Sequence, residues 1–220
     1  MGSFDFATIA KILPGVVAGL TCHEFMHGFV AYRCGDPTAR DQGRLSLNPL
    51  RHVDLFGTVL LPLMLWSAGA PVFGYAKPVP VNAAHYADLR HGQLATGLAG
   101  PAANLALAIL GGGVAWTAWL LGAADSGVMA WLWLVGAAFT EVNLALMFFN
   151  LIPIPPLDGS SVLPLFLSNR GLYVYYRLRQ YAFPLLIAIL WGVPALFQVD
   201  PIGAYFRHTV DPLFSLLVPR

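Results

Sequence analysis

The residues best suited to chemistry form an H-E-x-x-H motif at 23–27, inside a long hydrophobic stretch. On an α-helix, His23 and His27 are four residues apart, so both imidazoles leave the same face one turn apart. This spacing offers two nitrogen ligands to one zinc ion, and Glu24 beside them can take a proton from water. Because the chain has two glutamates and 6 histidines, chance predicts roughly 0.0015 matches to this pattern.

A structural alternative is that these polar side chains only hold helices together. Ionisable groups in an apolar helix are costly, however, and are therefore typical of functional sites. We interpret the motif as a metal site, which needs a third protein ligand and leaves a fourth position for water. Asp158 stands out among the candidates because three prolines at 153–156 break a helix just before it. The other candidates are His52, His85, His91 and His208, of which we expect the last three to lie at the surface.

The composition is typical of a membrane protein. Hydrophobic residues make up 57% of the chain and charged residues 10%, with a mean hydropathy of +0.66. The net charge of +1, without a basic run, excludes a nucleic-acid partner and leaves the lipid bilayer as the expected surroundings. The N-terminus shows no pattern of a removable signal peptide. Cys22 and Cys34 lie roughly 18 Å apart on one helix, so they cannot form a disulfide.

Apolar runs predict an all-α polytopic membrane protein made of one domain, 1–220. The expected helices cover 5–33, 93–122, 128–152, 181–198 and 202–218. The first three form a catalytic core at about 8–165, and C-terminal helices follow at about 172–218. Glu141 lies in the middle of the third helix, and we expect it to be buried against other helices and to take no part in catalysis.

Shorter elements are expected between the first two long helices. Alternating residues predict β-strands at 43–49 and 77–81, the second restricted to a sheet edge by two prolines. The apolar segment 55–74 is interrupted by glycine and proline, which favours a re-entrant hairpin. Nine of the twelve basic residues lie at 33–51, 77–90 and 170–179, so the positive-inside rule places these three regions in the cytoplasm.

The motif at 23–27, A-G-P-A-A-N at 99–104 and N-L-I-P-I-P-P-L-D-G at 150–159 occur in this order, each on an apolar helix. Together they resemble the site-2 protease family of intramembrane zinc metalloproteases. The segments 43–52 (G-R-L-S-L-N-P-L-R-H) and 74–82 (G-Y-A-K-P-V-P-V-N) are similar to its small prokaryotic branch without a PDZ domain. The resemblance covers about residues 8–165. It implies one Zn²⁺ held by His23, His27 and Asp158, with Glu24 as the base.

The expected function is therefore zinc-dependent hydrolysis of peptide bonds within or near the transmembrane segments of membrane-protein substrates. Asn104 and Asn150 are candidates to bind the oxyanion or the substrate backbone, although each could instead join two helices. His52 is a possible accessory residue near the cytoplasmic mouth. The expected location is the inner membrane, with the active site open to the cytoplasm. Nothing in the sequence indicates an oligomeric state. The alternative is a metal-binding membrane protein without proteolysis, either a transporter or a regulatory homologue.

Overall fold

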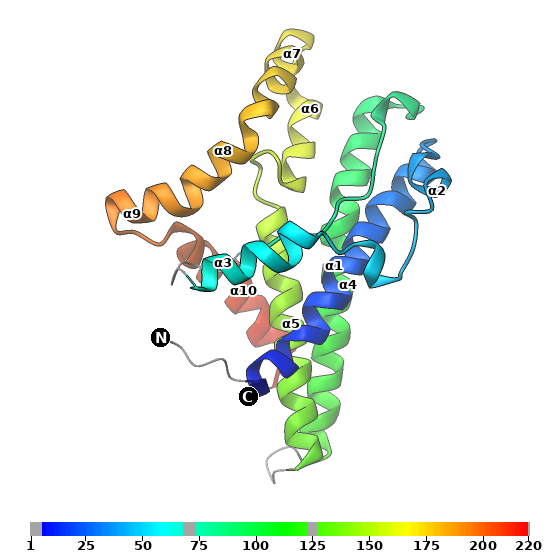
Figure 1. Ribbon diagram of the computed structural model, residues 1–220. Helices are drawn as coiled ribbons and strands as arrows, with labels where there is room; N and C mark the ends of the chain where they lie inside the picture. The colour runs from blue at the N-terminus through cyan, green and yellow to red at the C-terminus, as the bar shows by residue number, and fades with distance from the viewer. Residues whose placement is uncertain (1–5, 68–73, 123–126, 220) are drawn as a thin grey trace.

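Three long helices form the centre of the protein. The computed structural model describes residues 6–67, 74–122 and 127–219. Helices α1 (Phe6–Arg33), α4 (Leu89–Leu120) and α5 (Val128–Asn150) pack against one another and run side by side (Figure 1). Their bounds lie within four residues of those predicted from the apolar runs. The prediction of a three-helix core is therefore confirmed.

Small residues set the spacing and direction of these helices. A side chain at Gly15 would touch Phe139, and one at Gly19 would touch Asn143, so α1 and α5 run in the same direction. A side chain at Gly111 would touch Thr140, while Asn104 contacts Gly19, so α4 runs in the opposite direction to both. Such close approach is typical of membrane helices, where packing replaces the hydrophobic effect. The arrangement places the C-terminal halves of α1 and α5 at the same end.

The remaining elements surround this core. Helix α10 (Pro201–Leu217) runs along α5, where Val210 meets Leu144 and Met147 in a buried cluster. The stretch before it bends repeatedly and contains α7 (Asn169–Leu178), η6 (Arg179–Tyr181), α8 (Ala182–Ile187), η7 (Ala188–Gly192) and α9 (Val193–Phe197). The short elements are α2 (Thr38–Asp41), η1 (Pro49–Arg51), η2 (Leu55–Leu60), α3 (Leu61–Ser67), η3 (Ala83–His85), η5 (Asp158–Val162) and α6 (Leu163–Phe166).

The β-strands predicted at 43–49 and 77–81 do not form, because the described residues there make no ladder. Their backbone groups bond to side chains instead. The Arg44 guanidinium donates to the carbonyl oxygens of Lys77 (3.0 Å) and Pro78 (3.2 Å), and the Val79 amide donates to Glu24. The two prolines in 77–81 also lack the amides that a ladder needs.

The segment 55–74 leaves the core and returns to it. It begins with η2 and α3, while residues 68–73 lie outside the described residues. The Tyr75 amide donates to the Gly57 carbonyl at 3.0 Å, and the Thr58 hydroxyl donates to the Tyr75 carbonyl at 2.9 Å. The two ends of the segment are therefore adjacent. This is what a re-entrant course requires, but how deep the segment lies in a membrane stays a prediction.

A buried carboxylate ties the end of α1 to the segment 74–87. Asp36 is fully buried and accepts hydrogen bonds from Thr38, the Asn82 amide and the His85 ring. Burial raises the pKa of this carboxyl, but the hydrogen bonds from Thr38, His85 and Asn82 outweigh it and lower the pKa to about 2. The charged form of Asp36 therefore holds the loop that covers the metal-binding helix.

We expect Asp36→Asn to lower the free energy of unfolding by about 1–3 kcal/mol, because an amide NH₂ would face several buried donors. Since the pKa of Asp36 is depressed in the fold, its stabilisation is present above roughly pH 4 and is lost as the pH falls toward 2. Thermal unfolding in detergent at pH 7 and pH 3 measures both effects. His85→Ala removes a half-exposed partner and should cost under about 1 kcal/mol. Equal melting temperatures for Asp36→Asn and wild type would contradict this role.

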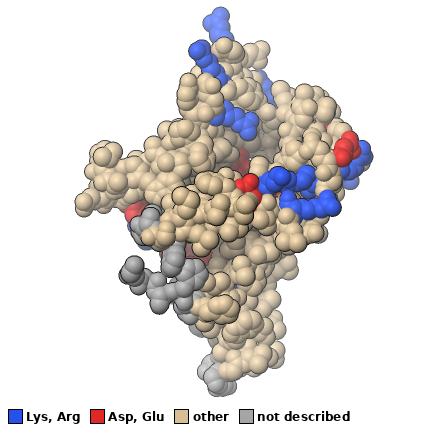
Figure 2. All heavy atoms as spheres, viewed as in Figure 1, with Lys and Arg blue, Asp and Glu red and all other residues tan. Residues whose placement is uncertain are grey.

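Four helical stretches are long and apolar enough to cross a membrane: α1, α4, α5 and the bent stretch Asn169–Phe197. The protein is thus a multi-pass membrane protein. Lysine and arginine gather toward one end, over α7 and around α2, whereas the other end carries few charges (Figure 2). The expectation that Glu141 is buried is wrong. Its side chain is exposed on α5.

Candidate metal centre

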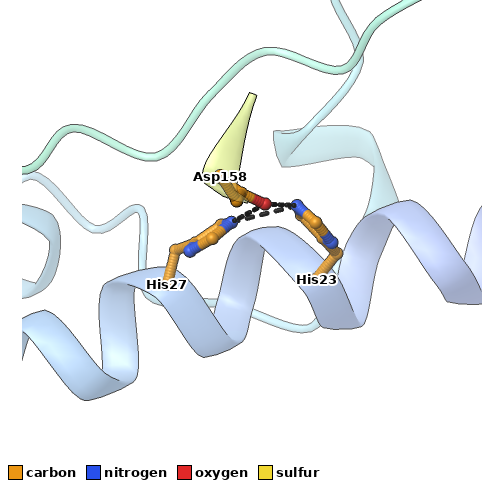
Figure 3. Close-up of side chains that lie close together, drawn as sticks. All are labelled: His23, His27 and Asp158. Carbon is orange, nitrogen blue, oxygen red and sulfur yellow. Dashed lines mark hydrogen bonds and ion pairs between the residues drawn. The ribbon is translucent and has the colours of Figure 1, made fainter. Parts of the chain in front are cut away.

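Three side chains from two distant parts of the chain converge beside α1. The Nε2 atoms of His23 and His27 lie 2.9 Å apart, and Asp158 Oδ2 lies 3.1 Å from the first and 3.3 Å from the second (Figure 3). Zinc with bonds of roughly 2.0–2.2 Å holds tetrahedral ligands roughly 3.3–3.6 Å apart. The three atoms therefore need shifts of only a few tenths of an ångström to share one ion. In the described residues they form the one group of three such ligands.

The far side of each imidazole fixes which nitrogen carries the proton. His23 Nδ1 lies 2.7 Å from Asn104 Oδ1, and His27 Nδ1 lies 2.6 Å from the Thr96 carbonyl oxygen. Both partners accept hydrogen bonds, so each Nδ1 carries the hydrogen and each Nε2 presents a lone pair. These two lone pairs face a buried carboxylate oxygen that has no hydrogen-bond donor. Three acceptors without a donor need a cation, and two nitrogens with one oxygen suit Zn²⁺.

Close helix approach keeps this space open. A side chain at Gly100 of α4 would lie 2.5 Å from His27 Nε2 and 2.6 Å from His23 Nε2. Even a methyl group there would occupy the room beside the ligand atoms. A side chain at Gly97 would collide with Ser161, which follows Asp158 in η5. The small-residue motif on α4 therefore lets both the histidines and the Asp158 turn pack against the helix.

Asp158 reaches the site because the chain cannot stay helical before it. Helix α5 ends at Asn150, and the prolines at 153, 155 and 156 prevent another helical turn. The chain passes through turns to η5, which begins at Asp158. The side chain of Asp158 remains 19% exposed. This partial access is what a site with an open coordination position needs.

Glu24 faces the same cavity. Its Oε2 accepts a hydrogen bond from the Val79 amide at 2.8 Å. The cavity has a volume of about 390 Å³. His23, Glu24, His27 and Asp158 line it, together with Val79 and Asn150. A base beside the metal ligands and room for a peptide are the two features that hydrolysis of an amide bond requires.

Asn104 does not face this cavity. It is fully buried, its Oδ1 pairs with His23, and its Nδ2 donates to the Gly19 carbonyl (3.2 Å) and to Asn143 Oδ1 (3.0 Å). No hydrogen of its amide remains for an oxyanion. The structure therefore agrees with the alternative that Asn104 joins helices, here α4 to α1 and α5, and its Oδ1 also orients His23. Asn150 does line the cavity, with its Nδ2 bonded to the Leu146 carbonyl of its own helix. Its substrate role stays a prediction.

The remaining histidines lie outside the cluster. His85, His91 and His208 are exposed as expected, and they bond to Asp36, Asp88 and the Ala204 carbonyl respectively. His52 is 3% exposed, and its Nε2 lies 2.7 Å from the Ser46 carbonyl. It does not line the cavity of the metal centre. Its position therefore gives no support to an accessory role in the chemistry.

We expect Asn104→Leu to weaken zinc affinity by roughly 10–100-fold, because the His23 ring loses the acceptor that orients it. Asn150→Ala is the matched control, since Asn150 bonds only to its own helix and should leave zinc affinity unchanged. Competition with a fluorescent zinc chelator measures both variants in detergent. Equal affinities in Asn104→Leu and wild type would show that His23 does not depend on this amide.

Sequence reasoning missed the backbone partners of the site. The Thr96 carbonyl that orients His27 and the Val79 amide that holds Glu24 belong to residues whose side chains give no hint of these contacts. The chain also places Tyr175, Tyr176 and Arg179 at the cavity wall. These residues were expected to belong to a basic cytoplasmic stretch at the start of the C-terminal helices, and no role at the site was predicted for them.

Comparison with known proteins agrees with this geometry. The chain is 35% identical over 165 residues to the Bacillus subtilis protein named "Putative zinc metalloprotease YwhC", covering 73% of this chain and 70% of that protein. It is 30% identical over 185 residues to "Putative zinc metalloprotease Rip2" of Mycolicibacterium smegmatis, covering 84% and 68%. The Mycobacterium tuberculosis protein of the same name is 29% identical over 209 residues, covering 93% and 73%. The chain belongs to the site-2 protease family.

No family profile and no solved structure matches the chain. As a member of the site-2 protease family, this chain is a zinc metalloprotease, and its cofactor is Zn²⁺. The donor set fits that ion, because His23, His27 and Asp158 present three acceptor atoms to one point. The metal motif of this chain lies on an apolar helix, α1.

Proposed function

We propose that this protein is an intramembrane zinc endopeptidase that hydrolyses peptide bonds within or near the transmembrane segments of membrane proteins. One observation carries the proposal: the three ligand atoms and the base Glu24 meet at a helix that is itself apolar enough to cross the membrane. His23 lies ten residues before the end of α1 at Arg33, roughly 15 Å along the helix. A substrate cut at this depth must bring its peptide bond into the bilayer.

The residues of the chain have distinct roles in this reaction. Zn²⁺, when held by His23, His27 and Asp158, lowers the pKa of water and polarises the scissile carbonyl group. Glu24 accepts a proton from the attacking water and returns it to the leaving amine. The Val79 amide holds the Glu24 carboxylate in place before substrate arrives. Asn150, at the cavity wall, is placed to donate to the substrate backbone.

Comparative membrane proteomics tests this function in cells. Cells that produce the Glu24→Gln protein should accumulate uncut transmembrane proteins or fragments that are short-lived in wild-type cells. The new termini in wild-type cells should map within or next to transmembrane segments. If the two membrane proteomes are identical, or if the new termini lie only in soluble domains, a metal-binding protein without intramembrane proteolysis becomes the better description.

We propose that the protein lies in the inner membrane, with the metal centre open to the cytoplasm and with 55–74 as a re-entrant segment. The basic residues around α2 and α7 support this orientation. Single cysteines at positions 42, 82 and 125, in a protein without Cys22 and Cys34, test it with an impermeant thiol reagent on intact cells. Position 125 lies outside the described residues. We expect labelling at 125 alone, whereas labelling at 82 would show that 55–74 crosses the membrane fully.

A further inference from the structure

The cavity of the metal centre has a wall that does not belong to the three-helix core. Tyr175, Tyr176 and Arg179 line the same cavity as His23, Glu24 and Asp158. They belong to α7 and to η6, which directly continues it, and α7 lies at the end where lysine and arginine gather (Figures 1 and 2). Arg179 lies four residues after Tyr175 and three after Tyr176, so it shares a helix face with each of them.

Hydrogen bonds dock this wall on the core. The Tyr175 hydroxyl donates to the carbonyl and to the hydroxyl oxygen of Ser160, at 3.2 Å each. The Tyr176 hydroxyl donates to Gln93 Oε1 on α4 at 2.9 Å. Ser160 lies two residues after the metal-binding Asp158. The position of α7 is therefore linked to the turn that carries Asp158 and to α4. The same contacts set the position of Arg179, which lies three residues after Tyr176.

Arg179 is a free cation at the cavity. Within residues 6–67, 74–122 and 127–219, its guanidinium has no ion pair and no hydrogen bond, and its side chain is exposed. The two carboxylates of the cavity have other roles, because Glu24 accepts from the Val79 amide and Asp158 belongs to the metal-ligand group. Of the cavity-lining residues, Arg179 alone is permanently cationic. Since no described residue pairs with it, the guanidinium is available to an anionic group that enters the cavity.

We propose that Arg179 binds a carboxylate side chain of the substrate near the scissile peptide bond, so that the enzyme prefers substrates with Asp or Glu there. This inference rests on the proposed protease function. A guanidinium suits the task because its planar fork pairs with a carboxylate through two parallel hydrogen bonds. A competing explanation is that Arg179 only anchors the helix at the membrane surface. Arg177, which is exposed but does not line the cavity, would serve that purpose equally well.

Purified wild type and the variants Arg179→Gln, Arg179→Glu and Arg177→Glu test the proposal in non-ionic detergent with zinc. The probe is a library of single-span peptides with amidated C-termini. Each peptide carries Glu, Gln or Lys at one position. The varied positions are those that flank the apolar span and those within four residues of its centre. Mass spectrometry gives the cut sites and the ratios of kcat/KM. Zinc content and melting temperature of every variant show that it is folded, and Glu24→Gln gives the background of cleavage.

We expect wild type to cut peptides with Glu at one or more positions roughly fivefold faster than the matched Gln peptides, mainly through a lower KM. Arg179→Gln should remove this difference, Arg179→Glu should favour Lys at the same position, and Arg177→Glu should behave as wild type. A Glu preference that persists in folded Arg179→Gln, or that is lost equally in Arg177→Glu, would overturn the inference, as would a wild type that cuts Glu and Gln peptides equally. If wild type cuts no peptide above the Glu24→Gln background, the proposed protease function itself fails.

Discussion

Glu24→Gln is expected to lower kcat by roughly 10²–10⁴-fold while the protein keeps its zinc and its fold. General acid–base catalysis contributes about this factor, and an amide cannot take the proton of the attacking water. The carbonyl oxygen of glutamine can still accept the hydrogen bond that the Val79 amide gives to Glu24. None of the three ligand atoms is altered. Cleavage of a single-span peptide and zinc content, measured on the same purified sample, check both parts of this prediction.

Glu141→Gln serves as the control, because it makes the same change at an exposed carboxylate that does not line the cavity. It should retain most of the activity. If Glu24→Gln loses zinc together with activity, Glu24 is a structural group of the metal centre and another residue must act as the base.

Asp158→Ala is expected to weaken zinc affinity by more than the 10–100-fold typical of residues that only orient a ligand. It removes a ligand atom that lies about 3.1–3.3 Å from both histidine nitrogens. Activity should fall with occupancy and should not return at moderate zinc concentrations. Zinc titration of the purified variants measures the change.

His52→Ala is the matched control for this prediction. His52 is buried and bonds to the Ser46 carbonyl, away from the cavity. Its replacement should lower stability and leave zinc bound. If His52→Ala loses zinc and Asp158→Ala does not, the third ligand has been assigned to the wrong residue.

The helices and the ligand set were predictable because both depend on local sequence. The apolar runs of α1, α4 and α5 are long enough to cross a membrane. A charged segment follows α1, and a proline-rich one follows α5. His23 and His27 share a helix face by spacing alone. Asp158 was identifiable because the prolines before it interrupt a helix at a depth where a carboxylate is costly.

The sequence did not predict contacts in which a hydrogen-bonding group finds its partner far along the chain. Alternating residues at 43–49 and 77–81 suggested strands, yet the Val79 amide bonds to Glu24, 55 residues away. The sequence left two roles open for Asn104. The choice depends on its contacts with His23 and Asn143, which only the packing of three helices brings together. For the same reason, no sequence pattern showed that Tyr175 and Tyr176 dock on Ser160 and Gln93.

The central claim is that two histidines and one carboxylate hold a catalytic zinc ion. X-ray absorption at the zinc edge of the purified wild-type protein tests it most directly. We expect one zinc per chain, with two imidazole nitrogens at roughly 2.0–2.1 Å and oxygen ligands at roughly 2.0–2.2 Å. In Asp158→Ala loaded with excess zinc, both imidazoles should remain and the carboxylate oxygen should be lost. A sulfur ligand at roughly 2.3 Å, or a single imidazole in the wild type, would contradict the site described here.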